Sequence, residues 1–524
     1  MNVTPGIDDR PCTVIVLAAG EGKRMRSALP KVLHPLLGRT MLGHVLATVG
    51  QALASDVSLG GARVVVVVGR GADQVRGHLA EIAPDVRTVL QERQGGTGHA
   101  VRVALAELPE SAGSVVVLNG DIPLLREATL RALVAGHRAS GAAATVLTAE
   151  VPEPGGLGRI VRGADGRVLG IVEERDATAE QRAVKEINAG AYVFDAAALR
   201  ATLAALPTDN DQGEEYLTDV FGLLVAGGSP VAAHRAEDLT ETLGANDRAE
   251  LASLRALMRD RVNREWLLSG VTIVDPATTW IDVTVTIEPD ALIEPNTHLR
   301  GATRIAQGST VGPDTTIIDA TIGAGATVVR AHVVGAVVGS GAQVGPFAYL
   351  RPGTRLATRA KIGTFVEAKA AEVGEGAKVP HLTYVGDATI GAGTNIGAAT
   401  VFVNYDGVNK FKTTVGAHAR TGADNMFVAP VNIGDGAYTA AGSVITEDVP
   451  PGAMAVARGR QRNIEGWVER RRAGTPAADA ARRAGAAGAA DAPVDTAAPG
   501  VGAQVGNRND GSGSTSVSTE LGPQ

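Results

Sequence analysis

The chain has 524 residues, of which 66 are glycine, 3% are aromatic and one is cysteine, and its net charge is −7. This length predicts two or three domains, and a hydrophobic fraction of 44% suffices for sizeable cores. The glycines lack the three-residue period of collagen, and the scarcity of aromatic rings argues against a β-sandwich. The acidic balance gives no electrostatic case for nucleic-acid binding. No apolar run reaches about 18 residues, so no membrane span is expected.

The single cysteine, Cys12, has no partner for an internal disulfide, which fits a reducing compartment. The charged residues Asp8, Asp9 and Arg10 precede only a short apolar run, which is typical of a buried strand rather than a signal peptide. We therefore expect a cytoplasmic protein.

Residues 13 to about 240 alternate between strand-like and helix-like segments. β-branched runs at 13–17, 63–68, 86–90 and 114–118 predict strands, and helical patterns fall near 40–54, 72–80 and 97–108. This alternation predicts a doubly wound, Rossmann-like α/β domain, whose ligands bind beyond the carboxyl ends of the parallel strands. Residues 158–174 are expected to form a hairpin, and residues 247–268 a linker helix between domains.

An aliphatic residue recurs every six positions from residue 281 onward. The positions are Ile281, Ile287, Ile293, Leu299, Ile305, Val311 and Ile317, then Ile322 and Val328, and then Val338, Val344, Leu350, Leu356 and Ile362. A hexapeptide repeat predicts a parallel β-helix, in which each coil stacks its aliphatic residue on the last. Small stacked side chains and glycine corners account for much of the unusual composition.

Two later segments depart from this pattern. Residues 401–413 are too polar to continue the coils and are expected to form a loop, which in repeat proteins often lies on the binding face. Hexads return from 432 to about 456. Residues 471–524 hold no aromatic residue and are rich in alanine, glycine and serine, which predicts a disordered tail.

Three predicted strands end in segments suited to phosphates or a metal. They are Leu17-Ala18-Ala19-Gly20-Glu21-Gly22-Lys23-Arg24-Met25, residues 91–98, and Leu118-Asn119-Gly120-Asp121. Small residues at a strand end let backbone N–H groups approach phosphates, while Arg24 and Lys31 supply positive charge. A carboxylate such as Asp121 suits Mg²⁺, which is usually held by one or two carboxylates plus substrate phosphates. Taken alone, the first motif also fits a tight turn and Asp121 a helix N-cap.

Taken together in chain order, these motifs and those that follow resemble one known family. The N-terminal set comprises residues 17–25 with Pro30-Lys31-Val32-Leu33, Gly96-Thr97-Gly98-His99-Ala100, Gly120-Asp121-Ile122-Pro123-Leu124, Gly158-Arg159-Ile160, Glu173, residues 186–190, residues 215–219 and Gly244-Ala245-Asn246. With the hexads behind it, the chain resembles, over about residues 12 to 470, the bacterial bifunctional N-acetylglucosamine-1-phosphate uridyltransferase/glucosamine-1-phosphate N-acetyltransferase family. The resemblance implies a left-handed β-helix, whereas the general crossover rule favours a right-handed one.

The resemblance implies a first domain that joins UTP to N-acetylglucosamine 1-phosphate and releases pyrophosphate, mostly through positioning and charge neutralisation. By this resemblance, Arg24 and Lys31 face the triphosphate, and Asp121 and Asn246 ligate Mg²⁺. The nucleotide or UDP-sugar would contact Leu17, Ala18, Ala19, Gly20, Lys31, Gln91, Gly96, Thr97, Asn119, Gly120, Asp121 and Asn246, with Gly158, Glu173 and Asn188 on the sugar. Lys23 replaces the family's usual Thr or Ser, and Asn119 replaces a common Tyr or Ser.

For the second domain, the resemblance rests on residues 349–353, 366–369, 381–387, 395–398 and 404–407. It implies that acetyl-CoA acetylates the amine of glucosamine 1-phosphate, with His381 as the proton acceptor; an imidazole of ordinary pKa about 6.5 suits that role. Arg351 and Lys369 would clamp the sugar phosphate beside Tyr384 and Asn395. The acetyl-CoA site would be lined by Ala398, Asn404, Tyr405, Ala423, Ala441 and Arg458. Ala423 replaces the family's usual Ser. From the residue types alone, His381 could be structural, and Arg351 and Lys369 could be solvated corner charges.

The expected organisation has four parts. A nucleotidyltransferase (uridyltransferase) domain spans 1–245, a linker helix 246–270, a β-helix acetyltransferase domain with a C-terminal arm 271–470, and a disordered tail 471–524. The resemblance implies a homotrimer formed through the β-helix and a role in UDP-N-acetylglucosamine synthesis for the cell wall.

Two alternatives remain: a nucleotidyltransferase whose hexads only regulate or oligomerise, and a non-enzymatic scaffold with a degenerate nucleotide-binding head. The loop at 404–410 and His381 argue against the first, and Asp121 and Asn246 against the second.

Overall fold

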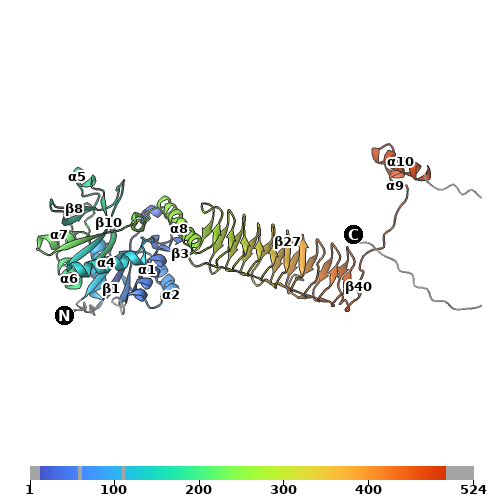
Figure 1. Cartoon of the computed structure of the whole chain (residues 1–524), viewed down its shortest axis with the longest axis horizontal. Coiled ribbons are helices and arrows are strands. Elements are labelled where there is room, and N and C mark those ends of the chain that lie inside the picture. The colour runs from blue at the N-terminus through green and yellow to red at the C-terminus, as the bar shows by residue number, and fades with distance from the viewer. Residues whose placement is uncertain (1–11, 57–61, 109–112, 491–524) are drawn as a thin grey trace, which may run out of the picture. The chain divides into compact units, whose positions relative to one another are not determined.

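The computed structural model describes residues 12–56, 62–108 and 113–490. The chain divides into two compact units, Met1–Arg458 and Gly459–Gln524. The first unit contains a helix-covered sheet and a stack of short parallel strands (Figure 1). Among the described residues we find no helix with the length and hydropathy needed to cross a bilayer.

The N-terminal sheet has the strand order β11-β7-β10-β6-β1-β4-β5, with β8 and β9 attached through β10. Its strands are β1 (Cys12–Ala18), β4 (Arg63–Val68), β5 (Arg87–Leu90), β6 (Ser114–Asn119), β7 (Ala144–Glu150), β8 (Arg159–Arg162), β9 (Val168–Val172), β10 (Glu186–Asp195) and β11 (Val231–Arg235). Strands β4, β5 and β6 run parallel with β1, while β10 runs antiparallel between β6 and β7. The carboxyl ends of β1, β4, β5 and β6 therefore share one edge.

Helices cover both faces of this sheet because alternate strand residues are apolar on each side. Apolar side chains of α1 (Met41–Ser55), α2 (Ala72–Ile82) and α4 (Glu127–Ser140) join one buried cluster, and those of α3 (Thr97–Ala106), α6 (Ala196–Leu203) and α7 (Asp219–Ala226) join the other. The shorter elements are η1 (Lys23–Met25), η2 (Lys31–Leu33), β2 (Pro35–Leu36), β3 (Arg39–Thr40), α5 (Ala179–Arg182) and η4 (Leu239–Thr242). The predicted Rossmann-like fold is confirmed, as is the hairpin, formed by β8 and β9.

The second part of the unit is the expected left-handed parallel β-helix, built as three columns of paired strands. The first column holds β12 (Thr272–Ile273), β15 (Leu292–Ile293), β18 (Thr310–Val311), β21 (Thr327–Val328), β24 (Gln343–Val344), β27 (Lys361–Thr364) and β30 (Lys378–His381), and later β35 (Arg420–Thr421), β38 (Tyr438–Thr439) and β40 (Met454–Ala455). Asn395 bridges its two halves, because it pairs with Lys378 below and Arg420 above.

The other two columns complete each coil. The second holds β13 (Trp280–Ile281), β16 (His298–Arg300), β19 (Thr316–Ile318), β22 (His332–Val334), β25 (Tyr349–Leu350), β28 (Glu367–Lys369), β31 (Tyr384–Gly386), β33 (Val401–Val403), β36 (Met426–Val428) and β39 (Val444–Ile445). The third holds β14 (Thr286–Ile287), β17 (Arg304–Ile305), β20 (Thr321–Ile322), β23 (Val337–Val338), β26 (Arg355–Leu356), β29 (Glu372–Val373), β32 (Ala388–Ile390), β34 (Thr413–Val415) and β37 (Val431–Ile433).

The hexad residues point inward, as predicted: Ile281, Ile293, Leu299, Val311 and Ile317 are all fully buried. Between Val328 and Val338 the step shortens to five residues, and Val333 fills the inward position. The gap in the six-residue repeat between Val328 and Val338 is therefore explained by a coil with shorter steps.

The predicted interruption at 401–413 is wrong at both ends. Phe402 is fully buried and pairs in register with Phe427, and their rings meet edge to face at 5.2 Å. Thr413 begins β34 and is also buried. The insertion therefore covers only residues 404–412, because an aromatic residue and its valine neighbours continue the coil despite the polar sequence that follows.

Helix α8 (Arg248–Leu268) and a short hairpin join the sheet region to the first coils. Leu251, Leu254 and Met258 of α8 belong to the same buried cluster as Ile273 and Ile281. In the hairpin formed by β2 and β3, the carbonyl of Leu37 accepts a hydrogen bond of 3.1 Å from the N–H of Val283. A side chain at Gly38 would place its Cβ 2.8 Å from that of Asp282, so the close approach requires glycine.

The second unit, described from 459 to 490, contains α9 (Trp467–Arg471) and α10 (Pro476–Ala490). Composition predicts disorder from residue 471 onward, whereas the structure has a helix over the first part of that segment. Alanine has the highest helix propensity, and Pro476 stands at the first helical position, where its missing N–H is not needed. The rest of the predicted tail, 491–524, lies outside the described residues.

Candidate functional sites

The loop after β1 folds closely over Lys31. Gly22 has φ +59°, and a Cβ at this position would lie 2.7 Å from Cβ of Lys31. Met25 is buried and anchors the turn, while Arg24 beside it is exposed. The N–H of Gly120 donates to the carbonyl of Leu17 over 2.9 Å, which ties the ends of β1 and β6 together. The loop is thus held by its own packing and leaves the Arg24 guanidinium facing solvent.

Lys31 joins the two residues expected to bind metal. Its Nζ donates a 2.8 Å hydrogen bond to Oδ1 of Asn246 and forms an ion pair with Oδ2 of Asp121. The Lys31 and Asp121 side chains are only 12% and 24% exposed. Although 125 positions separate them, Asp121 and Asn246 therefore direct oxygen atoms at one cationic nitrogen. Asp121 is not a helix N-cap, because α4 begins at Glu127.

The second loop, after β5, is organised by Gln91. The Gln91 side chain is buried, and its Nε2 contacts the carbonyl of Gly96 at 3.0 Å and Nδ1 of His99 at 2.9 Å. Thr97 begins α3, and its Oγ1 accepts a 3.0 Å hydrogen bond from the N–H of Leu217. Gly96 has φ +99°, and a Cβ there would lie 2.5 Å from the carbonyl oxygen of Glu215. The side-chain amide of Gln91 is thus engaged in shaping the loop.

The three residues expected at the sugar lie together. A Cβ on Gly158 would be 3.4 Å from Oε2 of Glu173 and 3.5 Å from Cβ of Asn188, and the N–H of Asn188 donates to the carbonyl of Gly158 over 2.9 Å. Asn119 is close to this group, since the N–H of Gly190 donates to Oδ1 of Asn188 over 3.1 Å and a Cβ on Gly190 would clash with Nδ2 of Asn119. Burial raises the pKa of the Glu173 carboxyl. The structure therefore provides a partly buried polar group from four distant segments.

Sequence reasoning missed two residues that hold this group. Thr218 is buried, and its hydroxyl donates a 3.0 Å hydrogen bond to Oε1 of Glu173, which opposes the rise in that carboxyl's pKa. The hydroxyl of Tyr192, also buried, accepts a 2.8 Å hydrogen bond from Nδ2 of Asn188. Thr218 belongs to the 215–219 motif, which was the available signal; Tyr192 has none.

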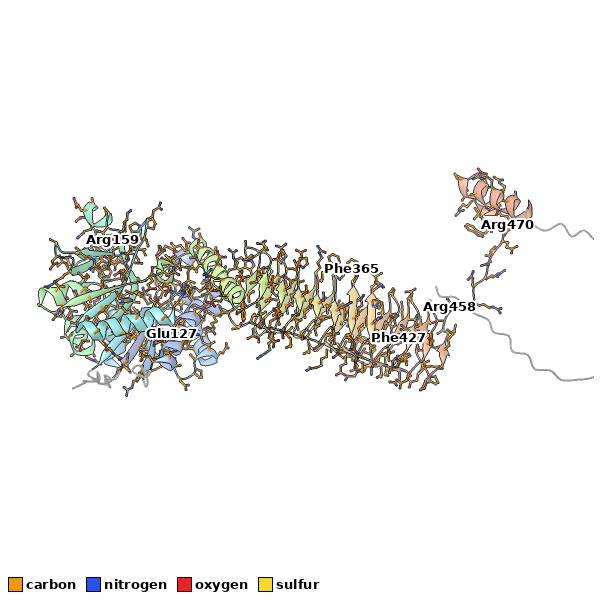
Figure 2. All side chains as sticks on the ribbon, in the orientation of Figure 1. Glu127, Arg159, Phe365, Phe427, Arg458 and Arg470 are labelled. Atoms are coloured by element: carbon orange, nitrogen blue, oxygen red, sulfur yellow. The ribbon has the colours of Figure 1, made fainter. Side chains whose placement is uncertain are left out.

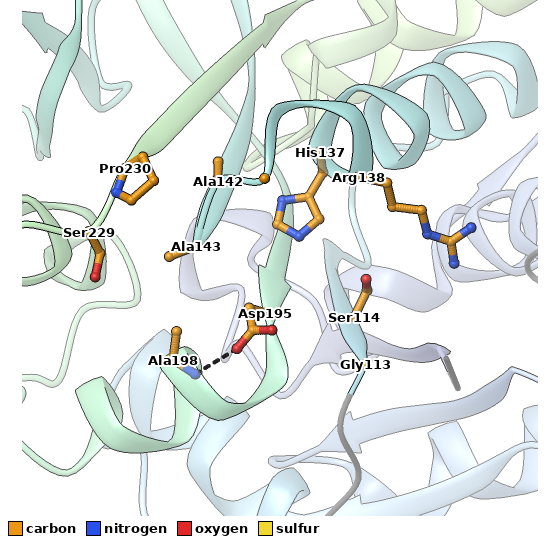
Figure 3. A pocket seen from close by; sticks show the side chains of 11 residues that line it. Gly113, Ser114, His137, Arg138, Ala142, Ala143, Asp195, Ala198, Ser229 and Pro230 are labelled. Carbon is orange, nitrogen blue, oxygen red and sulfur yellow. Dashed lines mark hydrogen bonds between the residues drawn. The ribbon is translucent and has the colours of Figure 1, made fainter. Parts of the chain in front are cut away.

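A separate cavity of about 240 Å³ lies at the opposite edge of the sheet, near the first residues of β6 and β7 (Figure 3). Its polar lining includes Ser114, His137 and Asp195. Nδ1 of His137 contacts the hydroxyl of Thr145 at 2.9 Å, and Asp195 caps α6. None of the site residues predicted from the sequence lines this cavity.

In the β-helix, the second column carries the basic residues expected at the sugar phosphate. Nη1 of Arg351 donates to Oε1 of Glu367 over 2.9 Å, and Nζ of Lys369 lies 3.1 Å from each carboxylate oxygen of Asp387. Tyr384 pairs with Glu367 in the strand register, and Lys369 with Gly386. The hydrogen bond that the Lys369 ammonium donates to the Asp387 carboxylate raises the pKa of Lys369. Both basic groups thus remain cationic on one outer face.

His381 ends β30 and is exposed, while Asn395 occupies the same column one coil further on. The insertion begins at Asn404, which is buried, and continues with Tyr405, which is 55% exposed and donates from its hydroxyl to the carbonyl of Gly407 over 2.6 Å. Its turn is fixed by Asp406, whose Oδ1 accepts from two backbone N–H groups.

The small residues expected at acetyl-CoA follow one corner of successive coils. The N–H of Asp424 donates to the carbonyl of Ala398 over 2.7 Å, and that of Gly442 to the carbonyl of Ala423 over 2.9 Å; Ala441 directly precedes Gly442. Arg458 is exposed and follows Ala457, whose carbonyl accepts from the N–H of Val444 in the last coil. The three alanines therefore form a ladder that ends near Arg458.

Another corner carries a row of exposed apolar residues. Phe347, Phe365 and Leu382 are 55%, 57% and 60% exposed and occupy equivalent positions in three successive coils (Figure 2, Phe365 labelled). The two phenylalanine rings stack at 5.3 Å with an interplanar angle of 9°. We refer to these three residues as the apolar row; its last member follows His381 directly.

Comparisons with known proteins cover both parts of the first unit. Residues 14–267 match the family of MobA-like NTP transferase domains. Bifunctional protein GlmU of Streptomyces coelicolor is 58% identical over 474 residues, which is 90% of this chain and 97% of that protein. The proteins of that name from Thermobifida fusca and Corynebacterium diphtheriae are 57% and 51% identical; they share 91% and 90% of this chain and 98% and 97% of their own lengths. The similarity to these three proteins spans the sheet and the β-helix.

Proposed function

The chain belongs to the bifunctional GlmU family, and from that premise we propose which of its residues perform each of the two reactions. It is a bifunctional enzyme of UDP-N-acetylglucosamine synthesis. One reaction acetylates glucosamine 1-phosphate, and the other transfers a uridylyl group from UTP to the acetylated sugar phosphate and releases pyrophosphate.

The uridylyl site is proposed at the carboxyl edge of the N-terminal sheet, and its residues fit Mg²⁺. The oxygens of Asp121 and Asn246 already converge on a single positive group, the Lys31 ammonium, and oxygen atoms are the ligands that Mg²⁺ prefers. When bound by Asp121, Asn246 and phosphate oxygens, the ion would neutralise charge that develops on the phosphates.

In this reaction an oxygen of the sugar phosphate attacks the α-phosphorus of UTP, and the bond from that phosphorus to the bridging oxygen of pyrophosphate breaks. Arg24 and Lys31 supply positive charge to the triphosphate. The backbone of residues 17–20 and of the Gln91–Thr97 loop would hold the nucleotide. Glu173, Asn188 and the backbone of Gly158 would receive the sugar, with Thr218 and Tyr192 fixing the two side chains.

The acetyl-transfer site is proposed on the outer face of the β-helix. The amine nitrogen attacks the thioester carbonyl carbon, the carbon–sulfur bond breaks, and CoA leaves as a thiol. His381 is the exposed base that takes the amine proton. Arg351 and Lys369 bind the sugar phosphate beside Tyr384 and Asn395. The alanine ladder of Ala398, Ala423 and Ala441 leaves room for acetyl-CoA beside Asn404, Tyr405 and Arg458.

We further propose a homotrimer assembled through the β-helix. The apolar row supports this proposal, because three large apolar side chains in contiguous coils are more than half exposed in the single chain. It also lies next to His381, so a neighbouring copy that covers the row would approach the acetyl-transfer site. Since UTP and acetyl-CoA are cytoplasmic metabolites, the enzyme is proposed to act there.

The convergence of Asp121 and Asn246 on Lys31 is the observation that carries the uridylyl assignment. The test is one coupled assay with glucosamine 1-phosphate, acetyl-CoA, UTP and Mg²⁺. UDP-N-acetylglucosamine should form only when acetyl-CoA is present. A requirement for pre-acetylated sugar phosphate would remove the acetyl-transfer assignment, and no turnover of either sugar phosphate would remove both.

A further inference from the structure

Asp387 stands where the coil of Lys369 meets the insertion that begins at Asn404. It follows β31 with φ +48°, a conformation that aspartate tolerates better than most residues. Its N–H donates to the carbonyl of Lys369 over 3.0 Å, and its own carbonyl accepts from the N–H of Thr413 over 3.3 Å. The backbone of Asp387 is therefore attached to the coil below and to the chain that returns from the insertion.

The Asp387 carboxylate binds one donor from each side. Both of its oxygens lie 3.1 Å from Nζ of Lys369, and Oδ2 also accepts a 2.5 Å hydrogen bond from Nδ2 of Asn404. The Lys369 and Asp387 side chains are 21% and 17% exposed, and Asn404 is buried. One carboxylate therefore connects the residue assigned to the sugar phosphate with a residue assigned to acetyl-CoA.

The neighbouring glycine shows how closely these groups pack. A Cβ on Gly386 would lie 2.5 Å from the hydroxyl of Tyr384 and 2.6 Å from Nδ2 of Asn404. Any side chain at Gly386 would displace both groups. Lys369, Tyr384 and Asn404 thus meet around Gly386 and Asp387, although they come from three different coils.

We propose that Asp387 is a positioning residue of the acetyltransferase, which fixes Lys369 and Asn404 relative to each other before either substrate binds. This inference rests on the acetyl-transfer function proposed above. A charge-assisted hydrogen bond is about twice as strong as a neutral one, so the carboxylate limits the rotamers of two side chains that would otherwise have to be ordered by the substrates.

A second ion pair of the β-helix is more exposed to solvent and provides a control. Arg359 and Glu375 pair over 2.5 Å with side chains 69% and 57% exposed. That pair connects adjacent coils at a solvated position, where an ion pair contributes little. Glu375→Gln removes the same charge as Asp387→Asn without touching a proposed substrate residue.

The test measures acetyl transfer by Asp387→Asn, Asp387→Glu, Glu375→Gln and the unaltered full chain, with kcat and KM for each substrate. Uridylyl transfer from pre-acetylated sugar phosphate reports whether the chain is folded. Asp387→Asn should lower kcat/KM for both glucosamine 1-phosphate and acetyl-CoA by roughly 10- to 100-fold, as expected for losing charge-assisted bonds. Asp387→Glu should recover part of this loss, and Glu375→Gln should match the unaltered chain.

A second measurement separates positioning from a general structural role. In a chain that already carries Lys369→Ala and Asn404→Ala, adding Asp387→Asn should cause no more than about a twofold further loss, because the carboxylate then has nothing to position. An equal additional loss in that background would overturn the proposal, as would normal kinetics of Asp387→Asn or a parallel loss of uridylyl transfer. If the unaltered chain transfers no acetyl group, the proposed acetyltransferase function fails, and this proposal fails with it.

Discussion

Replacing Lys31 by methionine should make the nucleotide-free protein bind divalent metal more tightly. In the structure, the Lys31 ammonium already contacts the oxygens of Asp121 and Asn246, so a metal ion must displace it. Lys31→Met keeps the length of the side chain and removes this competition. The same substitution should slow uridylyl transfer, because the charge that faces the triphosphate is lost.

The size of the effect follows from the contacts. A hydrogen bond to a charged group contributes about 1.5–3 kcal/mol, and the two side chains of the ion pair are only 12% and 24% exposed, which limits solvent screening. When a metal ion displaces the Lys31 ammonium, water solvates that group and recovers part of the lost interaction energy. Relief of about 1.4–2.8 kcal/mol corresponds to roughly 10- to 100-fold tighter binding.

The assay is a titration with Mn²⁺, followed by the paramagnetic resonance of the free ion, on the nucleotide-free full chain. Lys23→Met is the matched control, since Lys23 lies in the same loop but is 79% exposed and pairs with Glu21. This control should leave the affinity unchanged, and Asp121→Asn should weaken it. Equal or weaker binding by Lys31→Met would refute the shared cation position and, with it, the assignment of Asp121 and Asn246 as metal ligands.

Three further predictions test the separation of the two sites and the packing beneath the first. Asp121→Ala should abolish pyrophosphate release from UTP while release of CoA from acetyl-CoA continues at its normal rate; a matching fall in CoA release would contradict independent sites. His381→Ala should do the reverse, and acetylation at an undiminished rate would remove His381 as the base. Burial lowers the pKa of His44 to about 4 from an ordinary 6.5, so between these values only the unfolded chain takes up the proton. The free energy of unfolding should therefore fall as the pH drops through this window, by about 3 kcal/mol in all. Urea unfolding of His44→Gln at pH 7 and pH 4.5 should show a smaller fall than the unaltered chain, and an equal fall would argue against the buried neutral imidazole.

The β-helix was predictable because its core repeats in the sequence. Each inward position must hold a small aliphatic residue, so a period of six shows directly which side chains stack. Val333 was missed where two consecutive steps are five residues long, and Phe402 was missed because the polar residues after it suggested a loop. Both errors arise from a local deviation in spacing or composition that the neighbouring coils tolerate.

The candidate sites were predictable only where a residue stands in a local motif. Gly120 and Asp121 follow a strand that neighbours β1, so the sheet topology alone brings them near Leu17. Asp387 ends the 381–387 motif and Tyr192 stands in none; both contact other side chains, and no spacing in the sequence marks such contacts. The helix over 476–490 was missed for a different reason: an alanine-rich segment has the composition of a disordered chain but the propensity of a helix.

The hairpin at 35–40, which contacts Val283, helps to cover the first coil of the β-helix, so the chain cannot be cut before this coil without exposing apolar surface. A solenoid exposes an apolar end unless something covers its first coil. Here Leu36, Leu37 and the apolar side of α8 share a buried cluster with Ile273 and Ile281, so they serve as the end cap. A fragment starting at residue 271 would lose this cap, and the apolar residues and unpaired strand edges of its first coil would be exposed to other molecules. The β-helix thus depends on the N-terminal part of the chain to bury the apolar end of its core.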